Sequence, residues 1–286
     1  MHLRQVLENA VRRLEDASVG SPRRNAEVLL MFALGCDRAY LYAHPERELT
    51  EPENARYDEA LEERGRGVPS QYITGHQEFW GLDLIVTPAV LIPRPETEHV
   101  VEAVLQLIEE APGGASVGRQ YPWRIADVGT GSGCIALALA QELPQAQIRG
   151  SDISPVALEI ARLNAARLQL AERVRWAPGD LLEGVETELD FVVSNPPYVG
   201  EGEADKVQRE VRQFEPREAV FAGPQGLDVI ARLIPQARTH LKARGWLLME
   251  IGYTQEEPVR ALLGDWGEVR TIPDLQGIPR VMAARR

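Results

Sequence analysis

Apolar residues near the start of the chain recur every three or four positions. Leu3, Val6, Leu7, Val11 and Leu14 follow this period, which places them on one face of a helix. Residues 22–35 and 51–65 carry two further helical patterns. Together they predict a small all-helical domain over residues 1–67.

Two runs of strand-forming residues flank Gly81 within residues 71–92. This pattern predicts a β-hairpin, and we assign residues 68–92 to a linker that contains it. A helix is expected to follow over residues 93–110, with acidic residues in its first turn. Residues 111–122 are rich in Gly, Pro and Ser, which favours an exposed loop.

From Trp123 onward, short apolar runs alternate with helical patterns. Strands are predicted at residues 124–129, 146–152, 173–180, 189–195, 245–252, 268–273 and 280–285. Helices are predicted between them at residues 134–143, 154–170, 227–241 and 254–263. Alternation of this kind predicts parallel βαβ units, and hence an α/β domain with a doubly wound sheet over residues 93–286.

Charge and cysteine content exclude several classes of protein. The net charge of -12 disfavours a nucleic-acid substrate, because the surface as a whole repels phosphates. Cys36 and Cys134 lack CxxC spacing and the histidines are scattered, so we expect no metal. The amphipathic N-terminus lacks the apolar core of a secretory signal, and no apolar run approaches membrane-spanning length. We therefore expect a reduced, cytoplasmic protein.

The stretch DVGTGSG, residues 127–133, lies where the first predicted strand turns into its helix. Glycines there can adopt positive φ and allow a ligand to reach the backbone at the carboxyl end of the sheet. In a dinucleotide fingerprint the third small residue would fall at Cys134, so the NAD interpretation fails in detail. A phosphate-binding Walker loop fails for want of Lys followed by Ser or Thr.

Two further acidic positions end predicted strands. Asp152 ends the second strand, where a carboxylate can accept hydrogen bonds from both hydroxyls of a ribose. A helix N-cap is an equally natural role for Asp152, and the two roles can coexist. Gly179 and Asp180 end the third strand, within reach of a bound base or simply in a turn.

Residues 191–200, FVVSNPPYVG, end the fourth strand with two prolines. Because proline fixes φ and cannot donate a backbone hydrogen bond, Asn195 is held extended and the Pro196 carbonyl has no strand partner. A strand end followed by a rigid turn would account for this pattern without any function. The neighbouring motifs must decide between a simple turn and a functional site.

The order DVGTGSG, SDISPVAL, GD and NPPY resembles that of class I S-adenosylmethionine-dependent methyltransferases. More narrowly, FWGLDLIVTPAVLIPRPETE together with NPPYV resembles the HemK or PrmC family, the glutamine methyltransferases of peptide chain release factors. The stretches FEPREAVFAGPQGLD, LLMEIG and DLQGIPRVMAAR are also similar to that family. The resemblance implies a Rossmann-like sheet of seven strands whose last pair is antiparallel.

The resemblance further implies a cofactor, a substrate and a set of site residues. The cofactor would be S-adenosyl-L-methionine, giving S-adenosyl-L-homocysteine, and the substrate a Gly-Gly-Gln glutamine of a release factor. Methylation of its N5 would modulate translation termination, with residues 1–67 recognising the partner. The implied cofactor residues are Asp127, Gly129, Thr130, Gly131, Ser132, Gly133, Asp152, Ile153, Gly179, Asp180, Leu181 and Asn195. The implied substrate residues are Asn195, Pro196, Pro197 and Tyr198, with Asn195, Pro196 and Tyr198 also catalytic.

The chemistry of an amide accounts for the NPPY motif. A carboxamide nitrogen is a poor nucleophile, so the enzyme must position it in line with the methyl group. The Asn195 side-chain oxygen and the Pro196 carbonyl offer two acceptors for the two hydrogens of one NH₂ group. The Tyr198 ring could line this pocket or only pack. Some family members have an aromatic residue where this chain has Leu181, which leaves adenine contact there open.

Three alternatives remain at this stage. An adenine-N6 nucleic-acid methyltransferase would present the same NH₂ group to the same motif, although the acidic balance counts against it. A non-catalytic protein with this fold is disfavoured by the intact glycine loop and Asn195. Arg94, Glu96 and Glu98 suit an ion-pair network at the domain junction as well as substrate contact. We expect a monomer that contacts neither nucleic acid nor membrane.

Overall fold

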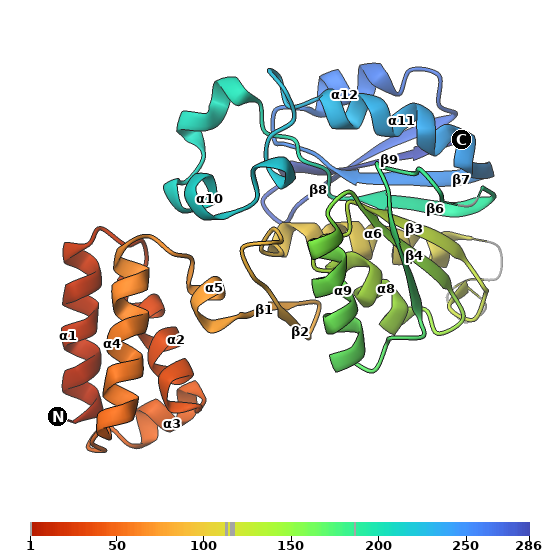
Figure 1. The fold of residues 1–286 in the computed structure, drawn as a ribbon. Helices are drawn as coiled ribbons and strands as arrows, with labels where there is room; N and C mark the ends of the chain where they lie inside the picture. Colours follow the sequence, from red (N-terminus) through yellow and green to blue (C-terminus); the bar gives the residue numbers. More distant parts are fainter. Residues whose placement is uncertain (1, 112–113, 115–117, 186) are drawn as a thin grey trace. The chain divides into compact units, whose positions relative to one another are not determined.

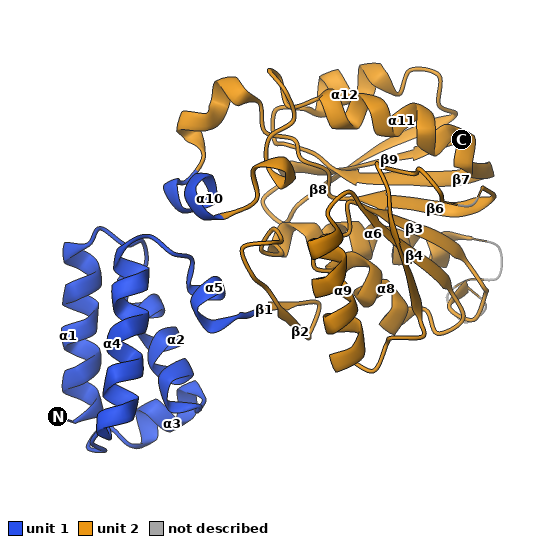
Figure 2. Ribbon diagram, viewed as in Figure 1, with its two compact units in different colours: residues 1–76, 208–214 blue, residues 77–207, 215–286 orange. Residues whose placement is uncertain are grey.

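The computed structural model describes residues 2–111, 114, 118–185 and 187–286. The chain forms two compact units, which Figure 2 distinguishes by colour. One comprises residues 1–76 and 208–214, and the other comprises residues 77–207 and 215–286. A short segment far along the chain therefore belongs with the N-terminal helices.

The first unit is helical, as the N-terminal pattern predicts. Its N-terminal helices are α1 (Leu3–Asp16), α2 (Pro22–Leu34), α3 (Arg38–Ala43), α4 (Glu51–Gly65) and α5 (Ser70–Thr74), shown in Figure 1. Leu14, Leu29 and Tyr57 are at most 2% exposed and form its core. Helix α4 begins with a capping box, in which Thr50 and Glu53 each bond the other's backbone N–H.

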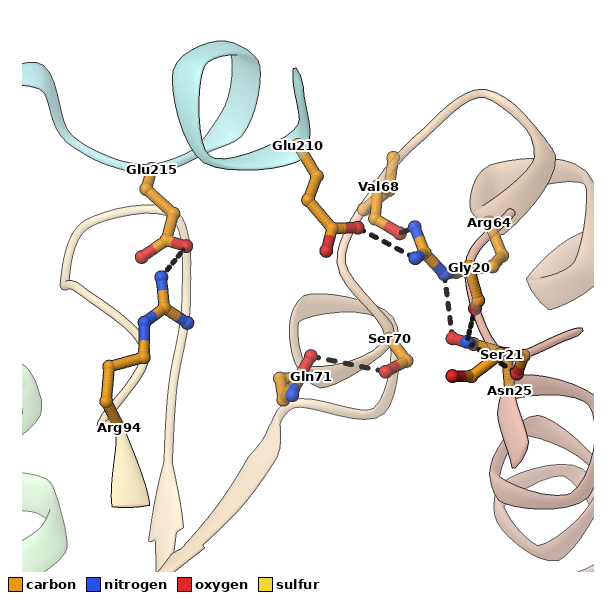
Figure 3. Close-up of polar contacts among 10 residues, drawn as sticks. All are labelled: Gly20, Ser21, Asn25, Arg64, Val68, Ser70, Gln71, Arg94, Glu210 and Glu215. Atoms are coloured by element: carbon orange, nitrogen blue, oxygen red, sulfur yellow. Dashed lines mark hydrogen bonds and ion pairs between the residues drawn. The ribbon is translucent and has the colours of Figure 1, made fainter. Parts of the chain in front are cut away.

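Helix α10 (Arg209–Phe214) joins this unit through a buried arginine. Arg64 is 6% exposed and donates to Asn25 Oδ1 (2.8 Å), the Val68 carbonyl (3.0 Å) and Glu210 Oε2 (2.7 Å). Figure 3 shows these contacts. One guanidinium thus ties α2, the end of α4 and α10 together.

The second unit contains a seven-stranded sheet in the order β5-β4-β3-β6-β7-β9-β8. The strands are β3 (Arg124–Val128), β4 (Gln147–Asp152), β5 (Val174–Pro178), β6 (Leu189–Ser194), β7 (Leu241–Glu250), β8 (Glu268–Pro273) and β9 (Pro279–Arg285). The first five in the spatial order pair in parallel, while β9 is antiparallel to both β7 and β8. The expected doubly wound sheet with an antiparallel end is confirmed.

Helices cover both faces of this sheet (Figure 1). Helices α6 (Glu98–Glu110), α8 (Cys134–Glu142) and α9 (Pro155–Arg167) contribute to one apolar cluster, which includes Phe191 and Val193 of β6. Helices α11 (Asp228–His240) and α12 (Glu256–Leu262) contribute to the other, which includes Val192. Successive residues of β6 therefore enter opposite cores, as expected for a central strand buried on both faces.

The predicted hairpin is present as β1 (His76–Phe79) and β2 (Leu82–Ile85). Trp80 (φ 54°) and Gly81 (φ 72°) form its turn with positive φ at both positions. Phe79 and Leu84 are at most 1% exposed in the core shared with α6 and α8. Residues 71–74, expected within the first strand, instead belong to α5 (Ser70–Thr74), which follows Pro69 and ends at the left-handed Gly75.

The irregular stretch after the NPPY motif contains three short helices. These are η2 (Glu201–Lys206), α10 and η3 (Arg217–Ala219). A further short helix, η1 (Pro95–Thr97), precedes α6. Of the loop expected at residues 111–122, residues 112–113 and 115–117 lie outside the described residues.

Candidate active site

A pocket of about 330 Å³ opens at the carboxyl ends of β3, β4, β5 and β6. The glycine loop, the turn after β4, the loop after β5 and the NPPY motif all contribute to its wall. Parallel α/β sheets bind ligands at this edge, because the loops that leave neighbouring strands converge there. The chain therefore brings most of the motifs selected from the sequence into one cavity.

The glycine loop lines the pocket through Gly129, Thr130, Gly131 and Ser132. Gly129 (φ +68°) and Gly131 (φ +54°) have left-handed backbones, and a Cβ at either would meet no heavy atom within 4 Å. Their backbones therefore border open space. Gly133 has a different role, because it lies outside the pocket wall and a Cβ there would be 3.0 Å from the Trp176 ring.

Asp127 lies beneath this loop and is 1% exposed. Its Oδ2 accepts from Thr130 Oγ1 (2.6 Å) and from the Ala136 N–H (3.1 Å), which fixes the shape of the turn. Burial raises the pKa of Asp127 to about 7. Among the described residues, Asp127 Oδ1 and Ser132 Oγ are buried without a hydrogen-bond partner. Ser132 lines the pocket and Asp127 does not, so the Ser132 hydroxyl is the unpartnered atom that the loop offers to a ligand there.

Asp152 lines the pocket at the end of β4. Its Oδ2 accepts from the Gly131 N–H (2.8 Å) and its Oδ1 from the Ser154 N–H (2.9 Å). The alternative role as a helix N-cap is wrong, because Ser154 occupies that position and accepts from the Ala157 N–H. Burial raises the pKa of Asp152. Each carboxylate oxygen retains lone pairs beside the pocket.

The mouth of the pocket has a mixed apolar and charged border. Ile153 lines it and is 66% exposed, which is high for a large aliphatic side chain. Gly179, Asp180 and Leu181 also line it, and Asp180 pairs with Arg232. Leu181 has a left-handed backbone (φ 59°) and its carbonyl accepts from Ser151 Oγ (2.9 Å).

Asn195, Pro196 and Pro197 form part of the pocket wall. The Asn195 Nδ2 group donates to Thr97 Oγ1 (3.0 Å), so the asparagine is held from behind. Tyr198 is not among the lining residues; its hydroxyl donates to Glu250 Oε1 (2.9 Å), and its ring packs against the core on the α11 side. The tyrosine therefore supports the loop in this structure.

The Gln255 side chain also holds the NPPY loop in place through hydrogen bonds. Its Nε2 donates to the Tyr198 carbonyl (2.8 Å) and to the Gly226 carbonyl (3.2 Å), and its Oε1 accepts from the Gly252 N–H (3.0 Å). Gly226 packs so closely that a Cβ there would lie 2.1 Å from the backbone carbonyl oxygen of Tyr198. The conformation of the loop is thus set by contacts as well as by its prolines.

Several supporting residues were not predicted as site residues from the sequence. Thr97, Glu250 and Glu215 are buried polar residues around the pocket. Glu215 pairs with Arg94 (Figure 3) and also accepts from the Ile92 N–H (3.1 Å). Glu98 accepts from the Trp80 N–H (2.8 Å). The only signal for these positions lay in the stretches LIPRPETE, FEPRE and LLMEIG, which carry the family resemblance.

In the described part of the chain, no group of three or more His, Cys, Asp or Glu side chains is arranged to hold a metal ion. No helix there is both long and apolar enough to cross a bilayer.

Solved structures with a similar fold include two methyltransferases. The catalytic domain of hMettl16, in complex with MAT2A 3′UTR hairpin 6, aligns with a TM-score of 0.56 at 18% identity, covering 82% of each chain. The Thermus thermophilus 16S rRNA N2 G1207 methyltransferase RsmC aligns with a TM-score of 0.53 at 18% identity, covering 74% of this chain and 49% of that one. At such identities the likeness establishes the class I methyltransferase fold alone.

Family models and full-length relatives give a narrower assignment. The PrmC N-terminal domain model matches residues 5–75, and the methyltransferase small domain model matches residues 118–213. A release factor glutamine methyltransferase from Koribacter versatilis is 56% identical, covering 100% of this chain and 99% of that protein. One from Moorella thermoacetica is 44% identical with the same coverage. With its site geometry and these full-length relatives, the chain belongs to the release factor glutamine methyltransferase family.

Proposed function

We propose that this protein transfers a methyl group from S-adenosylmethionine to the side-chain amide nitrogen of the glutamine in the Gly-Gly-Gln motif of peptide chain release factors. The observation that carries the proposal is the shared pocket: Asn195 and Pro196 line the same cavity as Gly129, Gly131 and Asp152. The motif proposed to bind the amide and the loop proposed to bind the cofactor therefore line the same cavity.

The pocket residues fit S-adenosylmethionine. The open backbones of Gly129 and Gly131 admit a ligand, and Ser132 Oγ, in the pocket wall, lacks a partner among the described residues. Asp152 has lone pairs left to accept from two ribose hydroxyls. Ile153 and Leu181 supply an apolar border suited to a flat base. When bound, the cofactor supplies an electrophilic methyl group on a sulfonium.

Asn195 and Pro196 would orient the substrate. The Asn195 Oδ1 and the Pro196 carbonyl accept the two hydrogens of the glutamine NH₂ group, so that the nitrogen lone pair points toward the methyl group. The same acceptors would stabilise the positive charge that develops on nitrogen as the new N–C bond forms and the S–C bond of the sulfonium breaks, which leaves S-adenosylhomocysteine as a neutral thioether. The nitrogen would then release one of its two protons to solvent, leaving a neutral N-methyl amide. Pre-orientation can recover up to roughly 7–11 kcal/mol of such a barrier.

Selection of one glutamine among many requires contacts away from the methyl group. We assign this recognition to the helical domain, residues 1–67, with residues 68–92 as linker and residues 93–286 as the catalytic domain. The compact helical unit also includes residues 208–214, so the proposed recognition surface extends to α10. We propose that the enzyme acts as a cytoplasmic monomer.

The test is incubation with labelled S-adenosylmethionine and purified release factor. We expect one methyl group per factor, located on the Gly-Gly-Gln glutamine by mass spectrometry, and none on a factor whose glutamine is replaced by alanine. Asn195→Ala serves as an enzyme control, expected to turn over about 10²–10³-fold more slowly at saturating cofactor. Label on nucleic acid but not on the release factor would contradict the proposal.

A further inference from the structure

Asn195 and Thr97, which both line the pocket, form a chain of hydrogen bonds with Glu250, which does not line it. Asn195 Nδ2 donates to Thr97 Oγ1 (3.0 Å), and Thr97 Oγ1 donates to Glu250 Oε2 (2.6 Å). Thr97 and Glu250 are each 1% exposed. Because bulk water does not reach these groups, a lost partner there would not be replaced at little cost.

The sheet explains why these residues meet. Strands β6 and β7 pair in parallel with Ser194 opposite Met249, so Asn195 and Glu250 follow at neighbouring carboxyl ends. Thr97, the last residue of η1, completes the chain of hydrogen bonds. The Tyr198 hydroxyl donates to the other carboxylate oxygen of Glu250 (2.9 Å), which prevents the carboxylate from rotating freely.

The Thr97 hydroxyl links the two hydrogen bonds in one direction. It has a single proton, which it donates to Glu250 Oε2 across 2.6 Å. The Thr97 oxygen must therefore accept from Asn195, and only Nδ2 of the asparagine carboxamide can donate. The Oδ1 atom is then the free polar atom of this pocket residue.

Stability alone is a poor explanation for Glu250. Its two partners are neutral hydroxyl groups, and a carboxylate buried on such partners is costly compared with an apolar side chain. Burial raises the pKa of Glu250, and hydrogen bonds from Thr97 and Tyr198 oppose that rise. Costly buried carboxylates are found more often where a site needs a fixed acceptor.

We propose that Glu250 and Thr97 are positioning residues that hold the Asn195 carboxamide with Oδ1 available to the substrate, so that the pocket selects an NH₂ group over a carboxylate. The proposal rests on the proposed function of the pocket. If the carboxamide were reversed, its Nδ2 would face the glutamine NH₂, donor against donor. An incorrect orientation would therefore slow the chemical step more than it weakens binding of the whole release factor.

The first test compares two substitutions at one position. Thr97→Val removes the hydroxyl and should lower kcat on release factor about 10–100-fold, with KM and cofactor affinity within about threefold of wild type. Thr97→Ser keeps the hydroxyl, loses only the methyl group and should restore kcat to within about threefold. Equal losses in both variants, or normal turnover in folded Thr97→Val, would overturn the proposal.

The second test reads the orientation directly and needs no substrate. Neutron diffraction of the wild-type protein should place an Asn195 Nδ2 deuterium toward Thr97. In Glu250→Leu, Thr97 loses the acceptor of its proton, so that proton can turn to Asn195 Oδ1 and the carboxamide should no longer hold a single orientation. An unchanged carboxamide in that variant would refute the role of Glu250. If the orientations are as stated but no release factor is methylated, only the proposed function fails.

Discussion

The backbone N–H of Gly131 donates to Oδ2 of Asp152 across 2.8 Å, tying the loop after β3 to the end of β4. The left-handed backbone of Gly131 brings its N–H to this carboxylate. The same carboxylate also accepts from the Ser154 N–H before α9. Asp152 therefore has two separable roles, because it shapes the glycine loop and also presents acceptors to the pocket.

Asp152→Ala should weaken S-adenosylmethionine binding by about 10–100-fold, since charge-assisted hydrogen bonds are worth roughly 1.5–3 kcal/mol. Titration calorimetry of the purified variant measures this. Asp190→Asn is the matched control: Asp190 also accepts a backbone N–H, from Arg124, and pairs with Lys242, but it does not line the pocket. Unchanged cofactor affinity in a folded Asp152→Ala variant would reduce the residue to a structural element of the loop.

The sequence could predict the elements whose signals are local. The apolar runs of β3 and β6 and the glycine loop each lie within a few consecutive residues, so pattern and motif sufficed. The supporting contacts could not be predicted this way, because Asn195 and Thr97 are 98 residues apart and Thr97 and Glu250 are 153 apart. Tertiary structure alone brings them together.

One expectation differed from the structure for an identifiable reason. The run before Gly75 has strand-forming residues, yet it is a short helix because Pro69 and the left-handed Gly75 bound it. For Tyr198 the sequence left pocket lining and packing open, because its hydroxyl contacts Glu250, 52 residues away in the chain. In both cases context outside the local pattern decided the outcome.

Cofactor affinity should depend on pH through Asp127, whose pKa burial raises to about 7. Below this pH the carboxyl is neutral, and above it the carboxylate attracts the cationic groups of S-adenosylmethionine. Affinity should therefore rise with pH toward about 7, by at most about tenfold per unit, and then level off. Calorimetry across the range checks this. Asp127→Asn should flatten the profile; an identical slope in that variant would assign the effect to another group.

Gly226 and Gly277 both have left-handed backbones, at φ +73° and φ +79°, but different surroundings. An alanine Cβ at position 226 would lie 2.1 Å from the backbone carbonyl oxygen of Tyr198. At position 277 an alanine Cβ would meet no heavy atom within 4 Å. Gly277→Ala should cost about 1–2 kcal/mol of backbone strain only. Gly226→Ala should cost about 3 kcal/mol or more and also lower kcat, because it displaces the NPPY loop. Thermal unfolding and steady-state kinetics compare the two, and equal effects would contradict this account.

The last prediction concerns the attachment of α10 to the helical unit. Arg64→Met should destabilise that unit by about 3 kcal/mol, because it leaves the partly buried Asn25 and Val68 acceptors and Glu210 without their shared donor. Arg66→Met, an exposed neighbour at the end of the same helix, is the matched control. Hydrogen exchange should accelerate over residues 208–214 only in Arg64→Met.

The functional consequence of losing Arg64 follows from chain connectivity. Residues 208–214 lie between Tyr198 of the NPPY motif and Glu215, which pairs with Arg94. If the helical unit recognises the release factor, Arg64→Met should lower kcat/KM on the intact factor while leaving cofactor affinity and turnover of a short Gly-Gly-Gln peptide nearly unchanged. A chain that starts near Val68 should behave in the same way, although it also removes every N-terminal partner of α10. Comparable losses on peptide and intact factor would instead show that α10 supports the pocket itself.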